Sequence, residues 1–536
     1  MIVSPRAVAA RPLFEDPRIR SHRWFLLAMM CLSLVLVVMS VSGLVTAIPR
    51  MQEELNASAS QVQWILDAYA VVFAGSLLTA GALGDRFGRK RALLSGLIVF
   101  GAGSVLAGLA TASSQVIAGR AVMGVGAALV MPATLSIITT IFSPEERGRA
   151  IGVWAGFAGA AGAIGPIVSG ALLQRFWWGS AVLVNLPLVA VTFLTISVFA
   201  PESRDETESP LDPVGAALSL VGLGSLVYAI IQGGEKGWST STVIGAAALA
   251  VVAIALFLRW ELRSDHPMLP LGFFRDRRFT LGSGVITVSF FVLFGFFFLA
   301  TQYLQFARGY SPLEAGVALL PLPIVFVAVS PSSASLAARF GAAPVIATGL
   351  GVVGAGFVLL TRLTPDTSYA YVAIALAVLG AGMGATAAPG TGEIMSAVPL
   401  SKAGVGSAVN DTTRELGGAL GIAILGSIAN SAYRASVNLS GLDLPPAAGA
   451  RAHESIGGAA SVALTTPQSR ALSQRAGSAF TDAFNRASIV SVAITLVAVV
   501  AVLLLGRSGN DASAEPIDDL DYELELVRIP VSETAE

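Results

Sequence analysis

Long apolar segments separated by short polar turns run along almost the whole chain. A helix that crosses a bilayer needs roughly 20 apolar residues, and fourteen segments meet or approach that length. They lie at 24–48, 61–83, 92–112, 115–142, 150–173, 181–200, 214–232, 239–258, 279–303, 313–335, 344–361, 369–395, 405–432 and 487–506. The pattern predicts an all-α polytopic membrane protein.

The lysines and arginines predict which side of the membrane each turn faces, because basic residues stay on the cytoplasmic side. With an even number of spans, both termini lie on the same side. If that side is cytoplasmic, it holds 21 of the 33 lysines and arginines, four of them at 86–91. We therefore expect a multi-pass protein of the cytoplasmic (inner) membrane, with both termini and the 84–91 turn in the cytoplasm.

The order of the spans predicts five regions. They are a basic cytoplasmic tail at 1–23, a six-helix bundle at 24–200, a linker with two extra transmembrane helices at 201–278, a second six-helix bundle at 279–506 and an acidic cytoplasmic tail at 507–536. The second bundle contains an external loop, 433–486, whose Ala, Ser, Gly and Pro are compatible with either a disordered segment or an external cap. Duplicated bundles place a binding site at their interface.

Composition excludes several functional classes. Hydrophobic residues make up 54% of the chain and charged residues 12%, whereas soluble domains have roughly 25% charged residues. A net charge of −1 gives no reason to expect nucleic acid as a partner. The single cysteine, Cys31, can form no intrachain disulfide, and three scattered histidines do not predict a histidine-rich metal site. No catalytic constellation is evident, so we do not expect an enzyme.

The turn between the second and third spans combines glycines, an aspartate and cations. Glycines allow a tight turn, the aspartate can face a helix N-terminus, and the arginines can hold neighbouring helix ends by charge. The motif consists of Gly81, Gly84, Asp85, Arg86, Gly88, Arg89 and Lys90. It resembles the loop between helices 2 and 3 of the major facilitator superfamily, and the fourteen spans resemble that family's drug:proton antiporter branch (multidrug efflux type). The fold implied is two six-helix bundles plus two inserted linker helices.

The fourth span contains Arg120, followed by Gly124 and Gly126. An arginine in hydrocarbon costs at least ~2.5–3.5 kcal/mol, so it needs a partner or a wet cavity. A nucleotide-binding loop is disfavoured because no strand precedes the glycines. The segment resembles the superfamily's fourth-helix motif, which implies a role for Arg120 in proton transfer. The alternative is a structural arginine that snorkels outward.

The fifth span carries glycines at every third position. Such a row drifts slowly around one face and permits close approach of another helix, while the following proline should bend the span. The residues are Gly156, Gly159, Gly162, Gly165, Pro166 and Gly170. The run resembles the antiporter motif of fifth helices, which implies an exporter.

The thirteenth span holds the densest polar group, Asp411, Arg414 and Glu415. Arg414 lies close enough along the helix to neutralise either carboxylate. The group resembles the thirteenth helix of the drug antiporter branch, which implies substrate and proton handling. The alternative is a solvated helix start.

Asp67 is the candidate proton carrier of the first half. It lies six residues into the second span, and Arg120 lies five residues into the fourth, which enters from the same face. Both depths come to roughly 8–9 Å, so the two side chains could meet. The alternative is a wet residue near the external interface. The first span has no acidic residue, and Ser40 stands where many family members have an aspartate.

The resemblance implies proton-coupled efflux of lipophilic, cationic drugs or toxic compounds by alternating access, without a cofactor or a metal. The expected partners are a small lipophilic substrate, protons and the bilayer, and we expect a monomer. An exporter of an endogenous lipid or metabolite is one alternative. A membrane scaffold or sensor that does not transport is another.

Overall fold

The computed structural model describes residues 13–205 and 211–506, which form helices joined by short turns, with no strand among them. The long helices are α1 (Pro17–Glu54), α2 (Ala59–Phe87), α3 (Arg89–Gly108), α4 (Ser113–Ile141), α5 (Pro144–Leu173), α7 (Asn185–Phe199), α8 (Pro213–Lys236), α9 (Ser241–Glu261), α10 (Arg277–Gln302), α12 (Pro321–Phe340), α13 (Ala342–Leu360), α14 (Tyr369–Ser396), α15 (Ala403–Ser436) and α18 (Ser469–Gly506). The short elements are η1 (Leu13–Glu15), α6 (Ser180–Leu183), η2 (Leu271–Arg275), η3 (Tyr303–Ala307), α11 (Pro312–Ala318), η4 (Leu400–Lys402), α16 (Pro446–Glu454) and α17 (Ile456–Ala463).

The predicted all-α polytopic fold is confirmed. In the described residues, 13 helical segments are long and apolar enough to cross a membrane, or 14 if the two parts of α5 count as one span. Those parts are bent by 43° between Gly159 and Ile164. The bend lies in the turn before Pro166, where the proline ring removes the helical hydrogen bond to residue 162.

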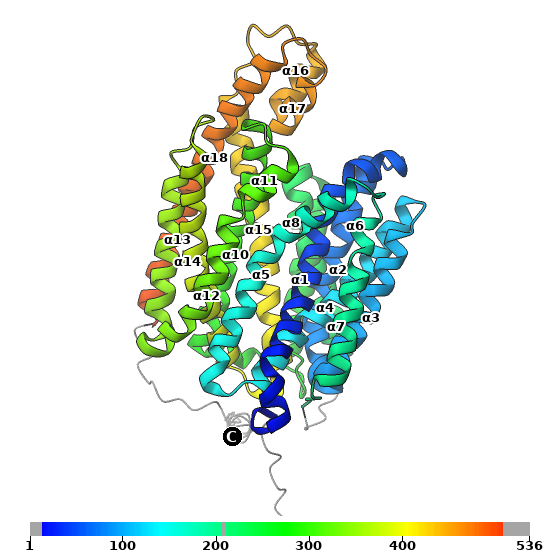
Figure 1. The fold of residues 1–536 in the computed structure, drawn as a ribbon, viewed down its shortest axis with the longest axis vertical. Helices are drawn as coiled ribbons and strands as arrows, with labels where there is room; N and C mark the ends of the chain where they lie inside the picture. Colours follow the sequence, from blue (N-terminus) through cyan, green and yellow to red (C-terminus); the bar gives the residue numbers. More distant parts are fainter. Residues whose placement is uncertain (1–12, 206–210, 507–536) are drawn as a thin grey trace, which may run out of the picture.

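The helices stand in two groups (Figure 1). In the first group α1 packs on α5, and α4 on α2 and α3; in the second, α10 packs on α15, and α14 on α12 and α13. The groups meet where α5 packs on α12 and where α2 packs on α15. The arrangement matches the two predicted bundles, and we call the groups the first and second bundle. The exact domain limits stay a prediction.

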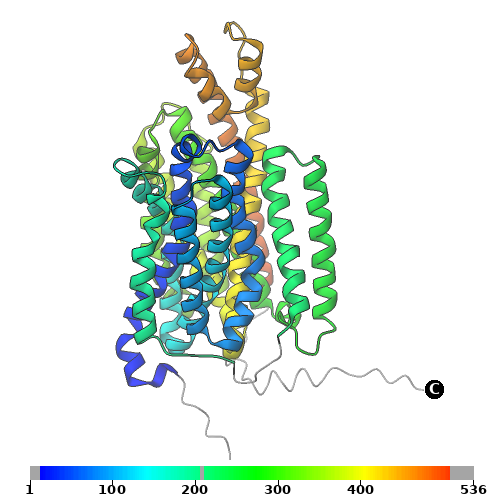
Figure 2. The same ribbon diagram turned by 90° about the vertical axis from the view of Figure 1, so that its right-hand side faces the viewer.

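The inserted helices α8 and α9 stand beside the two bundles (Figure 2). Helix α9 packs on α8, and α8 packs on both α2 and α15. The contact with α2 is close because Gly75 has no side chain: a Cβ atom there would lie 2.8 Å from the carbonyl oxygen of Leu220. Farther along, Trp64 stacks on Tyr228 with ring centroids 5.6 Å apart. The linker pair is therefore docked on the bundles.

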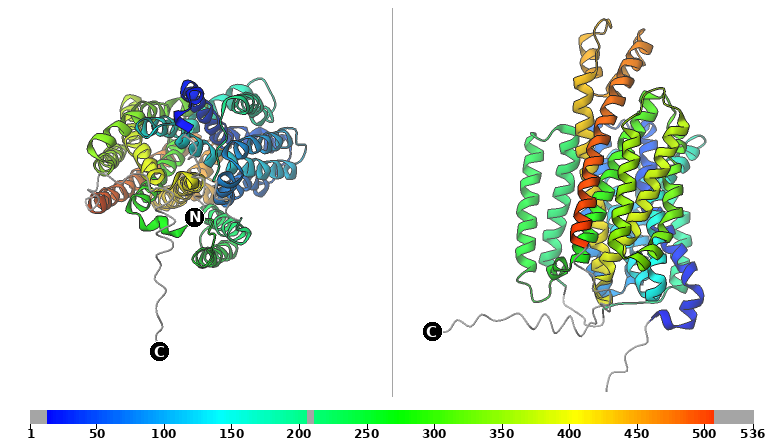
Figure 3. Two further views of the ribbon diagram at one scale, coloured as in Figure 1. Left: turned by 90° about the horizontal axis from the view of Figure 1, so that it is seen from below. Right: turned by 90° about the vertical axis from the view of Figure 1, so that its left-hand side faces the viewer.

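The first and last described residues lie toward one end of the molecule, which we call the basal end; α16 and α17 lie at the other, the apical end (Figure 3). Helices α15 and α18 have 34 and 38 residues, or about 51 and 57 Å at 1.5 Å per residue. Both exceed the roughly 30 Å of a bilayer core. They extend apically and carry α16 and α17, so 433–486 forms a helical cap, one of the two possibilities that the sequence leaves open.

Candidate functional site

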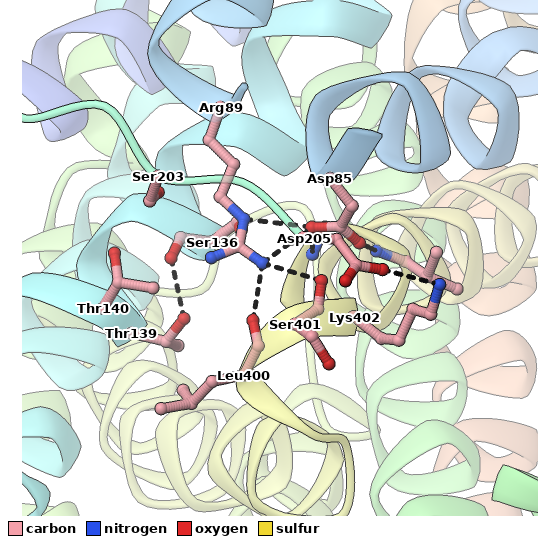
Figure 4. A network of polar contacts seen from close by, with 12 residues as sticks. Asp85, Arg89, Ser136, Thr139, Thr140, Ser203, Asp205, Leu400, Ser401 and Lys402 are labelled. Carbon is pink, nitrogen blue, oxygen red and sulfur yellow. Dashed lines mark hydrogen bonds and ion pairs between the residues drawn. The ribbon is translucent and has the colours of Figure 1, made fainter. Parts of the chain in front are cut away.

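Asp85, near the basal end of α2, caps a helix of the other bundle. Its carboxylate is 3% exposed and accepts the backbone N–H groups of Gly404 (2.8 Å) and Val405 (3.0 Å) at the start of α15 (Figure 4). Lys402, at the N-cap position of α15, makes no capping hydrogen bond with its own side chain. A carboxylate at this place satisfies orphan N–H groups and complements the positive end of the helix dipole. The predicted contact between Asp85 and a helix N-terminus is confirmed.

Arg89, the first residue of α3, completes this contact. Its Nε and Nη2 atoms donate to Oδ1 of Asp85 at 3.0 and 2.8 Å, and Nη2 also donates to the carbonyl oxygens of Leu400 (2.5 Å) and Ser401 (3.1 Å). The guanidinium therefore reaches the other bundle directly. Removing one partner of such a buried pair typically costs about 3–5 kcal/mol.

The glycines of the turn differ in how much space they have. A Cβ atom on Gly81 would lie 2.5 Å from the carbonyl oxygen of Gly404, so only glycine permits this approach of α2 to α15. Gly88 has a φ of +110°, and a Cβ atom there would meet the Glu202 carboxylate. Gly84 has more room, since the nearest atom to its Cβ position is 3.5 Å away.

The two remaining cations of the motif have contacts within the first bundle. The ammonium of Lys90 donates to the carbonyl oxygen of Ser197 at 2.9 Å. The guanidinium of Arg86 lies 5.4 Å from the ring centre of Phe87.

The segment that follows α7 belongs to the same network, although its sequence does not predict this. Asp205 is 4% exposed; its carboxylate pairs with the ammonium of Lys402 at 2.9 Å, and its N–H donates to the carbonyl oxygen of Asp85 at 2.7 Å. The N–H of Arg89 donates to the carbonyl oxygen of Ser203 at 2.9 Å. Asp205 lies in a charged run, PESRDE, where nothing distinguishes it from its neighbours. We call these contacts of Asp85, Arg89, Asp205 and Lys402 the basal network.

The polar group of α15 lies where the bundles meet. Asp411 is fully buried, which is incompatible with a solvated helix start, and its Oδ1 atom lies 3.8 Å from Nη1 of Arg414. The guanidinium of Arg414 lies 5.1 Å from the ring centre of Trp154 on α5 and 4.4 Å from that of Phe290 on α10. One side chain therefore contacts aromatic rings from both bundles. Oδ2 of Asp411 has no hydrogen-bond partner in the described part of the chain.

Glu415 lies one helical turn beyond Asp411 and is half-buried. Its carboxylate is within electrostatic range of Arg414 and of the Tyr69 hydroxyl on α2. The ring of Tyr69 in turn lies against Arg120, whose guanidinium carbon is 4.3 Å from the ring centre.

Arg120 is 1% exposed, which argues against a side chain that snorkels outward. Its Nε atom donates to the carbonyl oxygen of Ile65 (3.1 Å) and Nη1 to that of Ser40 (3.3 Å). The first helix thus contributes a backbone acceptor at Ser40, where the expected aspartate is absent. Nη2 has no hydrogen-bond partner among the described residues.

The predicted meeting of Asp67 with Arg120 is wrong. Asp67 is buried, and its Oδ2 atom accepts a hydrogen bond from Nε2 of Gln232 on α8 at 3.0 Å. Arg120 contacts Ile65 and Tyr69, which lie two residues before and after Asp67. At about 100° per residue, Asp67 points roughly 160° away from those two residues. The two residues lie at a similar level along α2, but the carboxylate of Asp67 is on the face of α2 opposite to the one that Arg120 contacts.

The glycines of α5 do not all face the same neighbouring helix. Gly156 and Gly159 approach Val327 and Phe326 on α12, whereas Gly165 lies against α1, where a Cβ atom would be 2.6 Å from the N atom of Gly43. Nine residues turn a helix by about 900°, so Gly156 and Gly165 point in opposite directions. Gly162 and Gly170 have no described atom within 4 Å of their Cβ positions. The row therefore allows close packing on both sides of α5.

The described residues contain no group of three or more His, Cys, Asp or Glu side chains arranged to hold a metal ion. What they contain is a set of buried charges at a helix interface. The hydrogen bonds from Asp85 and Arg89 to η4 and α15 join the two bundles, so they break if the basal ends of the bundles separate. Such a set suits conformational change and charge compensation better than bond chemistry.

Comparison with known proteins agrees with this arrangement. A family model described as Major Facilitator Superfamily matches residues 30–422. The chain is 36% identical to the multidrug efflux pump LfrA of Mycolicibacterium smegmatis, covering 90% of this chain and 96% of that protein. It is 33% identical to the methyl viologen resistance protein SmvA of Salmonella typhimurium, with 90% and 97% covered. It is 30% identical to the tetracenomycin C resistance and export protein of Streptomyces glaucescens, with 92% and 94% covered.

A solved structure shows the same fold at low sequence identity. The human organic anion transporter MFSD10 covers 90% of this chain and 100% of its own, with a TM-score of 0.56 and 13% identity. The family model, the relatives that match over most of their length and the paired helix bundles establish that this chain belongs to the Major Facilitator Superfamily and is a membrane transporter, not an enzyme.

Proposed function

We propose that this transporter exports small lipophilic cations, including drugs, across the cytoplasmic membrane in exchange for protons. The observation that carries the proposal is the buried Asp411 beside Arg414, at the interface of the two bundles. Ionisable residues within membrane spans are expensive and mark ion or proton pathways. The relatives named for multidrug efflux, resistance and export support the outward direction and the drug-like substrate.

The cationic class rests on the side chains around Arg414. Trp154 and Phe290 present ring faces to its guanidinium, and Asp411 supplies a carboxylate. Aromatic faces and a desolvated carboxylate attract organic cations for the same electrostatic reason. The apolar surroundings of the group suit the lipophilic part of such a substrate.

Proton coupling is assigned to the carboxylates Asp67, Asp411 and Glu415. Arg414 is the cationic neighbour of the two carboxylates on α15, whereas Arg120 is a separate buried charge of the first bundle. Movement of a proton down the membrane potential releases ~2.3 kcal/mol per 100 mV. This free energy favours one direction of transport when a carboxylate is open alternately to the two sides of the membrane. We assign a gating role to the basal network, because the contacts of Asp85 with the N-terminus of α15 would have to break before α2 could leave α15. We infer from the basic turns that the basal end is cytoplasmic.

The test is transport by the purified protein in proteoliposomes with an imposed pH gradient, with tetraphenylphosphonium as the probe. We expect accumulation that depends on the gradient and is lost in Asp411→Asn, while counterflow without a gradient persists. Gradient-independent flux would contradict proton coupling. Flux of a neutral lipid probe but not of the cation would indicate an exporter of endogenous lipids, and absence of any counterflow would indicate a scaffold or sensor.

A further inference from the structure

The carboxylate of Asp67 receives a hydrogen bond from outside the two bundles. Asp67 and Gln232 are 5% and 2% exposed, and Nε2 of Gln232 donates to Oδ2 of Asp67 at 3.0 Å. A buried carboxylate requires hydrogen-bond donors, because leaving it without them is costly in a medium of low polarity. The donor here comes from α8, the first of the inserted helices, 165 residues away in sequence.

The second atom of this amide is unused. Oε1 of Gln232 is buried and has no hydrogen-bond partner in the part of the chain that the structure describes. A glutamine amide carries both donors and an acceptor. Its N–H suits the ionised carboxylate of Asp67, and a half-turn of the amide would present Oε1 to the O–H of the protonated form. Gln232 can therefore serve both protonation states of Asp67 without moving its helix.

Helix α8 is placed so that this contact responds to movement of the bundles. One side of α8 packs on α2 through Leu220 and Gly75, and near its apical end a Cβ atom on Gly234 would lie 3.4 Å from Ala423 on α15. Because α8 touches both bundles, a shift of α2 relative to α15 changes the position of Gln232 relative to at least one of them. If α8 were only a fixed spacer between the bundles, it would not need a buried hydrogen bond from Gln232 to the carboxylate of Asp67.

We propose that Gln232 is a positioning residue that holds the Asp67 carboxylate in both protonation states and so makes the inserted helix α8 part of the proton-coupling machinery. This inference rests on the proposed proton-coupled function. Among the charged side chains that the structure describes, Arg120 on α4 faces α2 near this level, and it approaches the opposite face of α2, at Ile65 and Tyr69.

The test compares Gln232→Met, which keeps the size of the side chain and removes its hydrogen bonds, with the wild-type protein. Two quantities are measured in inverted vesicles: accumulation of tetraphenylphosphonium driven by a pH gradient, and counterflow of the same cation without a gradient. We expect accumulation to fall roughly tenfold or more, the scale of losing one hydrogen bond to a charged group, and counterflow to stay near wild type. A merely structural role would lower both together.

The matched control is Ser219→Ala, on the same helix. Ser219 is buried, and its hydroxyl donates only to the carbonyl oxygen of Ala216 within α8. We expect this variant to retain both activities. Full gradient-driven accumulation by Gln232→Met at wild-type expression would overturn the inference.

Asp67→Asn separates this inference from the proposed function. If Gln232 acts through Asp67, the double variant Asp67→Asn/Gln232→Met should behave like Asp67→Asn alone. An additive further loss in the double variant would contradict the positioning role. If Asp67→Asn is uncoupled while Gln232→Met is normal, the inference about Gln232 fails alone. If Asp67→Asn accumulates the cation fully, the proton-carrying role of Asp67 fails and the inference fails with it.

Discussion

Asp85 accepts the backbone N–H of Gly404 at 2.8 Å, so a residue of the first bundle caps a helix of the second (Figure 4). A helix cap normally comes from the residue that directly precedes the helix. Here the cap exists only while the basal ends of α2 and α15 are together. The hydrogen bonds that cap the first turn of α15 therefore also hold the basal ends of the two bundles together.

We expect Asp85→Asn to weaken closure of the basal end. Asparagine is a competent N-cap, but it leaves the buried guanidinium of Arg89 without its charged partner, at a cost of about 3–5 kcal/mol. Transport should fall while the equilibrium affinity for substrate stays near wild type, as measured by flux and by binding to the purified protein. The control is Glu146→Gln, which removes an ion pair with Arg23 (2.7 Å) inside the first bundle. Unchanged flux in Asp85→Asn would remove the gating role.

The pair Asp205–Lys402 should also hold the basal ends of the two bundles together. Asp205→Lys places two cations together and should reduce transport, whereas the exchanged pair Asp205→Lys/Lys402→Asp should recover a large part of it. Rates of substrate flux for the two variants test this. Glu202→Gln is a comparison from the same segment, since the ion pair of Glu202 with Arg91 (3.7 Å) lies within one bundle and is largely exposed. No recovery in the exchanged pair, at normal expression, would argue against a direct interaction during the cycle.

Gly81→Ala should keep the basal ends apart. Its Cβ atom would lie 2.5 Å from the carbonyl oxygen of Gly404, and backbone cannot yield as a flexible side chain can. In a Cys31→Ser background, a cysteine at Ser401 should then react faster with a maleimide applied from the basal side. Gly84→Ala is the control, because the nearest atom to its Cβ position is 3.5 Å away. Equal labelling rates in the two variants would contradict the requirement for close helix approach.

The orientation in the membrane is tested by labelling at both ends. We expect Arg91→Cys and Leu464→Cys, each in a Cys31→Ser background, to react with an impermeant maleimide from opposite sides, with the basal end cytoplasmic. Both positions are accessible, at 73% and 89% exposed. Position 88 is less suitable because the φ of Gly88 is +110°. Labelling of both cysteines from the same side would refute the topology.

Features that depend on local sequence could be predicted without a structure. Hydropathy over some 20 residues is a property of each segment alone, so the helical spans and the polytopic fold were predicted correctly. The turn that contains Asp85 could also be located from the sequence, because its glycines and charged residues follow one another along the chain. The position of Arg120 inside a span likewise follows from the sequence, since burial of a charge within a long apolar run needs no knowledge of the neighbours.

Pairing between segments depended on the tertiary structure. The sequence predicts that Asp67 and Arg120 lie at a similar depth in the membrane, but it does not predict which face of α2 carries Asp67 toward which neighbour. In the folded protein the carboxylate faces Gln232 on α8. Asp205 meets Lys402 although 197 residues separate them. Regular spacing in sequence fixes which residues share a helix face, whereas the helix that covers each face is decided by how all the helices pack together.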